Sequence, residues 1–288
     1  MIISNKTNGR THEYHSEATI LEGFLKQPLD QQIKPQAYAK LPIEGGYFDQ
    51  RLDDFKLAQV ISIRSGYTQV AGNLDPKADH GWSTLTTTVV EGLNILNVVT
   101  ADRIVGQIIT EHPLEGYVPS ISFLGTHFDN LRIAGHPVDV KCNLNILGDR
   151  RADDSSYTQD SDVKERIAFQ ENGLGEHKGF LAGLRESYNR LFPPAGGSEG
   201  KREALECSLV NQVIGAHPGT GSGHVIRIPN FGTIVLARVT VTHEDYKPDS
   251  DVPRKTTVRL SMMDLNLGCV ISGDGGIGIG SSNGGTKP

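Results

Sequence analysis

The sequence predicts a mainly β protein, either an antiparallel β-sandwich or a β-solenoid-like domain, with a small helical insertion. Two observations support this prediction. Several stretches alternate apolar and polar residues, most clearly Val138–Ile146, where every second residue is apolar. A period of two is typical of a strand with one buried and one solvated face. The chain also contains 33 glycines in 288 residues, above the usual share of ~7%, which favours many turns.

The overall composition excludes some partner classes. Hydrophobic residues make up 37% of the chain and charged residues 22%, which is enough apolar material for a folded core. The formal net charge is −6 and the pI is near 5.9. Nucleic acids and anionic membranes are bound by positively charged surfaces, so we expect no nucleic-acid partner.

The first third of the chain predicts edge segments followed by a hairpin. Short apolar pieces in residues 16–48 are separated by Pro28, Pro35 and Pro42. Proline removes a ladder donor, so these pieces are expected at sheet edges or as covering segments. Phe55–Arg64 is a strand candidate, and the composition of Gly72–Gly81 is that of a loop.

The stretch from Trp82 to Leu147 has the densest β pattern and is expected to organise the fold. Its candidate strands are residues 83–90, 103–111, 120–124 and 138–146. Between Leu93 and Val98 the apolar residues change phase. This change predicts a β-bulge near Leu96–Asn97 that re-aims the strand.

Residues 149–204 are polar, charged and helix-prone, and they interrupt two β-rich regions. Asp162–Glu165 resembles a helix-capping box, with a short helix ending near Asn172–Gly173. The spacing of apolar residues predicts a second, amphipathic helix over residues 176–191. After it, the spacing of Leu205, Leu209 and Val213 fits a helix, whereas Cys207–Ile214 fits a strand equally well.

β patterning resumes in the last part of the chain, with strands expected at Ile234–Thr242 and within Thr256–Ile271. Residues 273–288 are rich in Gly, Ser and Asn and are expected to form a flexible tail. The predicted organisation is therefore one discontinuous β domain, residues 14–148 and 205–272, interrupted by the helical and loop insertion at 149–204.

The order of these features resembles the choice-of-anchor P family of bacterial β-rich proteins. The resembling pieces are Leu41–Gly46, Val98–Asp102, Asn130–Val138, Ile228–Leu236 and Thr257–Leu265. The resemblance implies a secreted or surface-displayed protein without an assigned catalytic activity, and it carries over no catalytic residues. This chain departs from the family pattern, because it shows no signal peptide or anchor and carries the insertion.

No apolar run approaches the ~20 residues of a membrane-spanning helix, and the N-terminus lacks the basic and apolar regions of a signal peptide. The sequence as given therefore predicts no membrane span and a cytoplasmic location. If a leader has been removed from a precursor, the expected location is secreted or at the cell surface.

The polar residues best suited to binding a ligand or a metal lie in or beside the stretch Trp82–Leu147. The candidate binding residues are His80, Trp82, His112, His127, Asp129 and His136. His127 and Asp129 share one face of a strand, because residues i and i+2 point the same way. Histidine and carboxylate side chains suit Zn²⁺ or Fe²⁺, so a site for a divalent metal would use His112, His127, Asp129 and His136. Structural or surface roles for these residues, and core packing for Trp82, are the favoured interpretations.

Glycine-rich strings elsewhere match catalytic motifs only in part. Gly196–Gly200 has the G-x-S-x-G pattern of a nucleophile elbow, but it follows a proline pair instead of an apolar strand. Gly219–His224 resembles a phosphate-binding loop but lacks the lysine and the helix that such loops need. No cofactor is therefore predicted.

Three functions remain open on the sequence. The first is a non-enzymatic structural or binding protein that self-associates through exposed strand edges; we expect a homo-oligomer. The second is a metal-dependent or acid–base enzyme that uses the histidines and carboxylates. The third is a carbohydrate or small-molecule binder that uses a sandwich face with Trp82.

Overall fold

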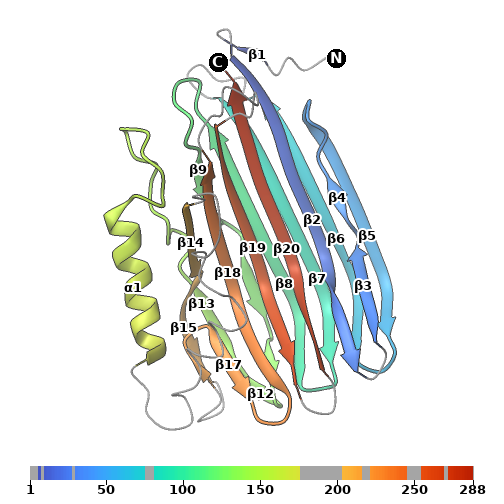
Figure 1. Ribbon diagram of the computed structural model, residues 1–288. Helices are drawn as coiled ribbons and strands as arrows, with labels where there is room; N and C mark the ends of the chain where they lie inside the picture. Colours follow the sequence, from blue (N-terminus) through green and yellow to red (C-terminus); the bar gives the residue numbers. More distant parts are fainter. Residues whose placement is uncertain are drawn as a thin grey trace.

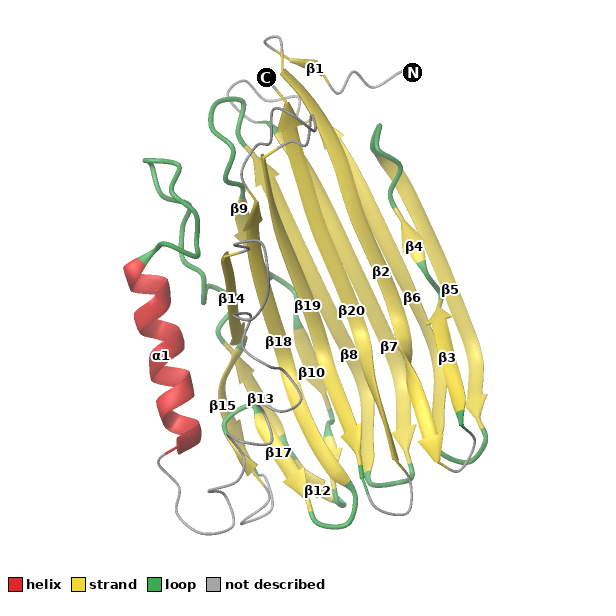
Figure 2. Ribbon diagram, viewed as in Figure 1, coloured by secondary structure: helices red, strands yellow, loops and turns green. Residues whose placement is uncertain are grey.

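The computed structural model confirms the mainly β class and resolves it as a sandwich of two antiparallel sheets (Figures 1 and 2). The structure describes residues 6–7, 10–27, 30–74, 81–175, 203–215, 221–244, 254–268 and 272–287. Strands are paired in antiparallel ladders throughout, and the two sheets pack face to face across an apolar interior. The solenoid alternative is therefore wrong.

The first sheet, called sheet A, has ten described strands in the order β1-β2-β20-β19-β18-β17-β16, with β3 and β4 paired to β2 and β14 paired to β18. Their bounds are β1 Lys6–Thr7, β2 Arg10–Gln27, β3 Gln31–Gln36, β4 Ala39–Lys40, β14 Glu203–Ser208, β16 Gly221–Ser222, β17 Val225–Ile228, β18 Gly232–Glu244, β19 Arg254–Leu267 and β20 Ser272–Lys287.

The second sheet, called sheet B, has eight described strands in the order β12-β11-β8-β7-β6-β5, with β9 and β10 paired to β8. Their bounds are β5 Gly46–Leu57, β6 Ile61–Leu74, β7 Trp82–Ile95, β8 Val99–His112, β9 Ser120–Ser122, β10 His127–Asp129, β11 Arg132–Ile133 and β12 His136–Pro137. The long strands β5 to β8 form a meander, because each is joined to the next by a short connection.

A short two-stranded sheet and one described helix complete the fold. The small sheet pairs β13 (Asp139–Cys142) with β15 (Val210–Ile214). Together with the pairing of β14 to β18, it shows that this segment forms two strands and not a helix. The helix α1 spans Ser161–Gly175 and packs Val163 and Ile167 into the core. Its first backbone N–H groups donate to the Asp160 carboxylate, so Asp160 is the capping residue. The predicted helix at 176–191 lies outside the described residues.

The expectation of a flexible tail is wrong. Residues 272–287 form β20, which lies between β2 and β19 near the middle of sheet A. The glycines of this segment allow close packing, because they have no side chain where atoms of neighbouring strands approach the backbone. A Cβ atom at Gly284, for example, would lie 2.6 Å from Nε2 of His112. Ladder hydrogen bonds on both sides hold this strand without a hydrophobic pattern.

Two details of the central stretch also differ from expectation. The perfectly alternating segment Val138–Ile146 is a strand only up to Cys142, because residues 143–148 turn and the N–H of Asn145 bonds the Asn143 side chain. The predicted bulge at Leu96–Asn97 is the hairpin turn between β7 and β8. Both of its residues have positive φ, 53° and 55°, as the turns that join tightly paired strands require.

Candidate functional site

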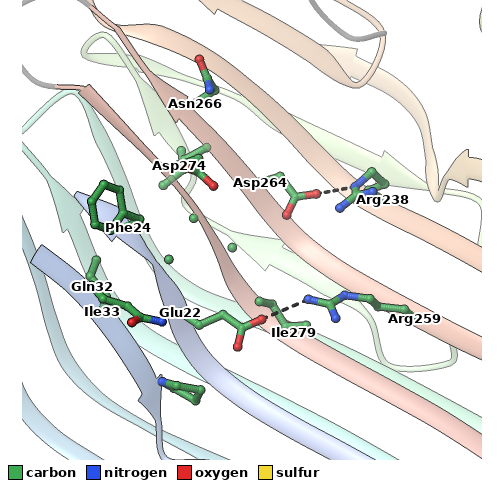
Figure 3. A pocket seen from close by; sticks show the side chains of 15 residues that line it. Glu22, Phe24, Gln32, Ile33, Arg238, Arg259, Asp264, Asn266, Asp274 and Ile279 are labelled. Atoms are coloured by element: carbon green, nitrogen blue, oxygen red, sulfur yellow. Dashed lines mark hydrogen bonds and ion pairs between the residues drawn. The ribbon is translucent and has the colours of Figure 1, made fainter. Parts of the chain in front are cut away.

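A groove of about 510 Å³ lies across sheet A and brings charged, polar and aromatic side chains together. Five strands form it, β2, β3, β18, β19 and β20, and Figure 3 shows their side chains gathered around the hollow. Residues that are far apart in the sequence meet here, because β20 pairs with β2 on one side and with β19 on the other.

An irregularity in three neighbouring strands turns polar side chains outward into this groove. Ala237 in β18 and Gly278 in β20 have positive φ, 46° and 63°, and both are skipped in the ladders at the level of Met262 in β19. Before Met262 the even-numbered residues of β19, such as Leu260, point into the core. After it the odd-numbered residues, such as Leu265, do so. Asp264 consequently lies on the outward face, next to the Arg238 side chain.

The floor of the groove is bare because β20 supplies glycines there. Gly275 and Gly276 line the hollow. A Cβ atom on Gly276 would lie 2.7 Å from Cδ1 of Ile279 and 3.1 Å from Oδ1 of Asp264. Since real Cβ atoms are rarely so close to other atoms, a larger residue at this position would fill the groove or displace its lining.

One wall is a fixed charge network. Nε of Arg238 donates to Oδ2 of Asp264 over 2.5 Å, and the Ser261 hydroxyl donates to Oδ1 of the same carboxylate over 2.7 Å. Nη1 of Arg238 also lies 3.6 Å from Glu206. With both oxygens engaged and only 12% of its side chain exposed, Asp264 is held in one orientation.

The opposite side is more accessible to a ligand. Glu22 and Arg259 form an ion pair of 3.1 Å with side chains 34% and 47% exposed. Asp274, Asn266 and Gln32 also line the groove, and their side chains make no hydrogen bond to other described residues. Phe24, 38% exposed, adds an aromatic wall. The groove thus offers donors, acceptors and an apolar surface together.

Sequence reasoning missed this groove. Its residues come from segments interpreted as an edge piece, a strand and a flexible tail, and no short motif links them. The available signal was weak: Asp264 is the one charged residue within Leu260–Leu267, and a carboxylate that becomes buried in such a strand needs a partner.

Two of the predicted residues, Trp82 and His112, come together, but inside the molecule. They face each other in the β7–β8 ladder and are 0% and 1% exposed. The His12 ring of β2 stacks on Trp82 at 5.0 Å and lies 4.6 Å from the His112 ring, with Tyr14 against its edge. These four side chains form the His–Trp cluster. Trp82 is a core residue, so it offers no surface to a ligand.

Burial controls the charge of this cluster. It lowers the pKa of His112 to about 3. Burial, followed by the nearby His112 and Arg10, lowers the pKa of His12 to about 2. Both rings are therefore neutral at physiological pH.

The remaining predicted residues do not converge with His112. His127 and Asp129 in β10 are exposed, and Nε2 of His127 lies 3.3 Å from Oδ2 of Asp129, as expected for side chains on one strand face. His127 pairs with Val105 of β8, seven residues before His112, a separation of about 24 Å at the rise of a strand. His136 in β12 is exposed and lies beyond β11.

The metal-site hypothesis is therefore wrong for these residues. The strands that carry His127, Asp129 and His136 lie far along β8 from His112, so the four side chains do not meet. No group of three or more metal-ligating side chains gathers within the described ranges. His80 lies outside the described residues, as does the G-x-S-x-G string.

Comparison with known families adds one match. The family model described as Domain of unknown function (DUF8256) matches residues 12–242. The chain belongs to this family. The match begins at His12 in β2 and ends in β18, so it covers sheet B and the His–Trp cluster, whereas β19 and β20 of the groove follow it.

No curated protein and no solved structure matches the chain. The DUF8256 match names no activity and no more specific family. Within the described residues, no helix is long and apolar enough to cross a membrane.

Proposed function

We propose that this protein is a non-enzymatic binding protein, and that the groove of sheet A holds a neutral, polyhydroxylated small molecule such as a saccharide. The observation that carries this proposal is the mixture of groups over the glycine floor. Carboxylates accept hydrogen bonds, guanidinium groups donate them, and the amides of Asn266 and Gln32 do both. Sugar hydroxyls also donate and accept, so they match such a surface.

The charge balance of the groove favours a neutral ligand over a polyanion. Its lining includes the carboxylates of Glu22, Asp264 and Asp274 and the guanidinium groups of Arg238 and Arg259. The formal sum is −1, and both arginines are already paired with carboxylates. A phosphate or sulfate would have to displace these pairs, which costs more than adding hydrogen bonds to neutral hydroxyls.

This proposal takes up the carbohydrate hypothesis of the sequence, with Phe24 in place of Trp82 as the aromatic wall. The enzyme hypothesis receives no support from the placement of His112, His127 and His136.

A panel of neutral mono- and oligosaccharides, with sulfated and phosphorylated sugars beside them, tests the proposal by isothermal titration calorimetry. We expect a neutral sugar to bind, and Asp274→Ala or Asn266→Ala to weaken binding about tenfold, since one lost hydrogen bond costs about 1 kcal/mol or more. Neither side chain makes a hydrogen bond to another described residue, so both variants should remain folded.

Thr100→Ala is the control, because Thr100 lies on β8 in sheet B, whereas all the strands that line the groove belong to sheet A. Its affinity should equal that of the parent protein. Failure of every neutral sugar to bind at millimolar concentration, or equal affinity of all three variants, would contradict the proposal. Preference for the anionic sugars would contradict its charge argument.

A further inference from the structure

Strand β5 forms a long edge of sheet B. It spans Gly46–Leu57 and, within the described residues, pairs only with β6. Figure 2 shows it at the outer side of the sandwich. The free N–H and C=O groups of an edge strand are a template for another strand. An edge of this length therefore needs either protection or a partner.

The side chains of β5 divide into two different faces. Asp49, Arg51 and Asp53 lie on one face together with Tyr47, and Arg51 is ion-paired with Asp53 at 3.3 Å. On the other face, Phe48 is 42% exposed and Leu52 packs against the core. Tyr47 is 60% exposed. Large aromatic side chains thus stand in solvent beside an open edge.

A backbone irregularity interrupts this edge. Asp53 pairs with Ser65 and Phe55 with Ile63, whereas Asp54 and Arg64 between them are skipped in the ladder, and Asp54 has a φ of 50°. Because a residue with positive φ departs from the extended conformation of a strand, a second strand would not pair regularly past this point. Only residues 46–53 are therefore available as a straight edge.

We propose that two copies of this chain form a dimer by antiparallel pairing of their β5 strands, with Gln50 on the twofold axis. This register places Asp49 opposite Arg51 of the second copy, twice by symmetry. It also places Phe48 opposite Leu52 of the second copy. Opposite charges and paired apolar residues across strands each stabilise a ladder by roughly 0.2–1 kcal/mol.

Neighbouring registers are less favourable. Centring the axis on Arg51 puts two arginines opposite each other and Asp49 opposite Asp53. Centring it on Asp49 opposes two aspartates. Centring it on Leu52 brings Asp54, which has positive φ, into the ladder opposite Gln50. Like charges directly opposite destabilise a pair, so the sequence of β5 selects the Gln50 register.

The pairing is isologous, so it uses the edge of both copies and closes as a dimer. Sheet B then continues across the two molecules. The groove lies on sheet A, so dimerisation and sugar binding depend on different residues. Either proposal can therefore fail without the other.

Charge reversal in the full chain tests the interface by analytical ultracentrifugation. The parent protein should sediment as a dimer. Arg51→Asp alone and Asp49→Arg alone should each weaken dimerisation at least tenfold, because each creates two like-charge contacts. The double variant Asp49→Arg/Arg51→Asp should restore it, since the two ion pairs return with their signs exchanged. Circular dichroism confirms that each variant is folded.

Lys56→Asp is the charge-reversal control, because Lys56 follows Asp54 and lies outside the proposed pairing, so this variant should dimerise like the parent. A second test introduces cysteine at Gln50, where the opposing Cα atoms of a ladder, about 4.5–5.5 Å apart, suit a disulfide. Oxidation should cross-link Gln50→Cys far faster than Lys56→Cys. A monomer at all concentrations, a dimer insensitive to both single reversals, or equal cross-linking at positions 50 and 56 would overturn the proposal.

Discussion

The space between the two sheets is filled differently in its two halves. Towards the hairpin that joins β7 and β8, the packing is purely apolar, with Ile20, Leu93, Ile95 and Ile104 each at most 2% exposed. At the other end, where β2 begins and β20 ends, the same inward faces carry the His–Trp cluster together with buried threonines and serines.

The polar half joins the sheets by hydrogen bonds. Ser16 of sheet A bonds Thr86 of sheet B at 2.5 Å, and Thr110 of sheet B bonds Ser282 of sheet A at 3.1 Å. Other buried polar atoms there have no hydrogen-bond partner among the described residues, namely Oη of Tyr14, Nε1 of Trp82, Oγ1 of Thr84 and both ring nitrogens of His112.

The apolar and polar halves of the interior therefore contribute differently to the fold. Apolar burial stabilises the first half by about 25 cal/mol for each Å² removed from water. In the second half an unsatisfied buried polar group costs about 1–3 kcal/mol. We infer that the apolar half carries most of the stability, while the polar half aligns the sheets through directional contacts.

The largest effect is expected from opening the apolar half. Ile104→Ala removes a side chain that is 0% exposed and leaves a cavity, so the free energy of unfolding should fall by about 2–5 kcal/mol. Urea denaturation measures it. Ile104→Val, which removes one methylene, should cost about 0.5–1.5 kcal/mol; equal losses in the two variants would contradict a well-packed apolar half.

Acid should act on the polar half. Unfolded histidine titrates near pH 6.5, whereas burial holds the pKa of His112 near 3 and that of His12 near 2. Below about pH 6.5 the unfolded chain binds more protons than the folded one. Stability is therefore full above that pH and falls as the pH drops, by up to about 1.4 kcal/mol per pH unit for each such histidine.

Thermal unfolding at pH 7, 6, 5 and 4.5 checks this slope. His112→Leu should flatten it, because one buried histidine no longer takes up a proton on unfolding. Some slope should remain, since burial also lowers the pKa of His224, to about 4. His127→Gln is the control, because the side chain of His127 is 46% exposed. Identical slopes for His112→Leu and the parent would show that His112 is not neutral and buried as described.

The smallest effect distinguishes two threonines in the same strand. Thr84→Val removes a buried hydroxyl that has no described partner, so we expect stability to be unchanged or to rise by up to about 1 kcal/mol. Thr86→Val breaks the bond to Ser16 and should cost about 1 kcal/mol or more. Calorimetric melting of both variants is the measurement, and the two signs should differ.

The period-two pattern of the sequence determined the fold class, because a strand between a core and solvent must alternate its residues. It placed β7, β8 and β18 close to their observed positions. It also predicted the contact between His127 and Asp129, since that contact depends on local geometry alone. Core packing of Trp82 followed from its size and apolar character.

Tertiary structure decided the rest. The glycine-rich end of the chain has no hydrophobic period, and only the flanking β2 and β19 make it a strand. The groove depends on β20 lying between strands that are over two hundred residues apart in sequence. The sequence also did not indicate which histidines lie in contact, because His12 belongs to sheet A and His112 to sheet B. Pairing between distant strands carries no local signal, so these features follow only from the folded chain.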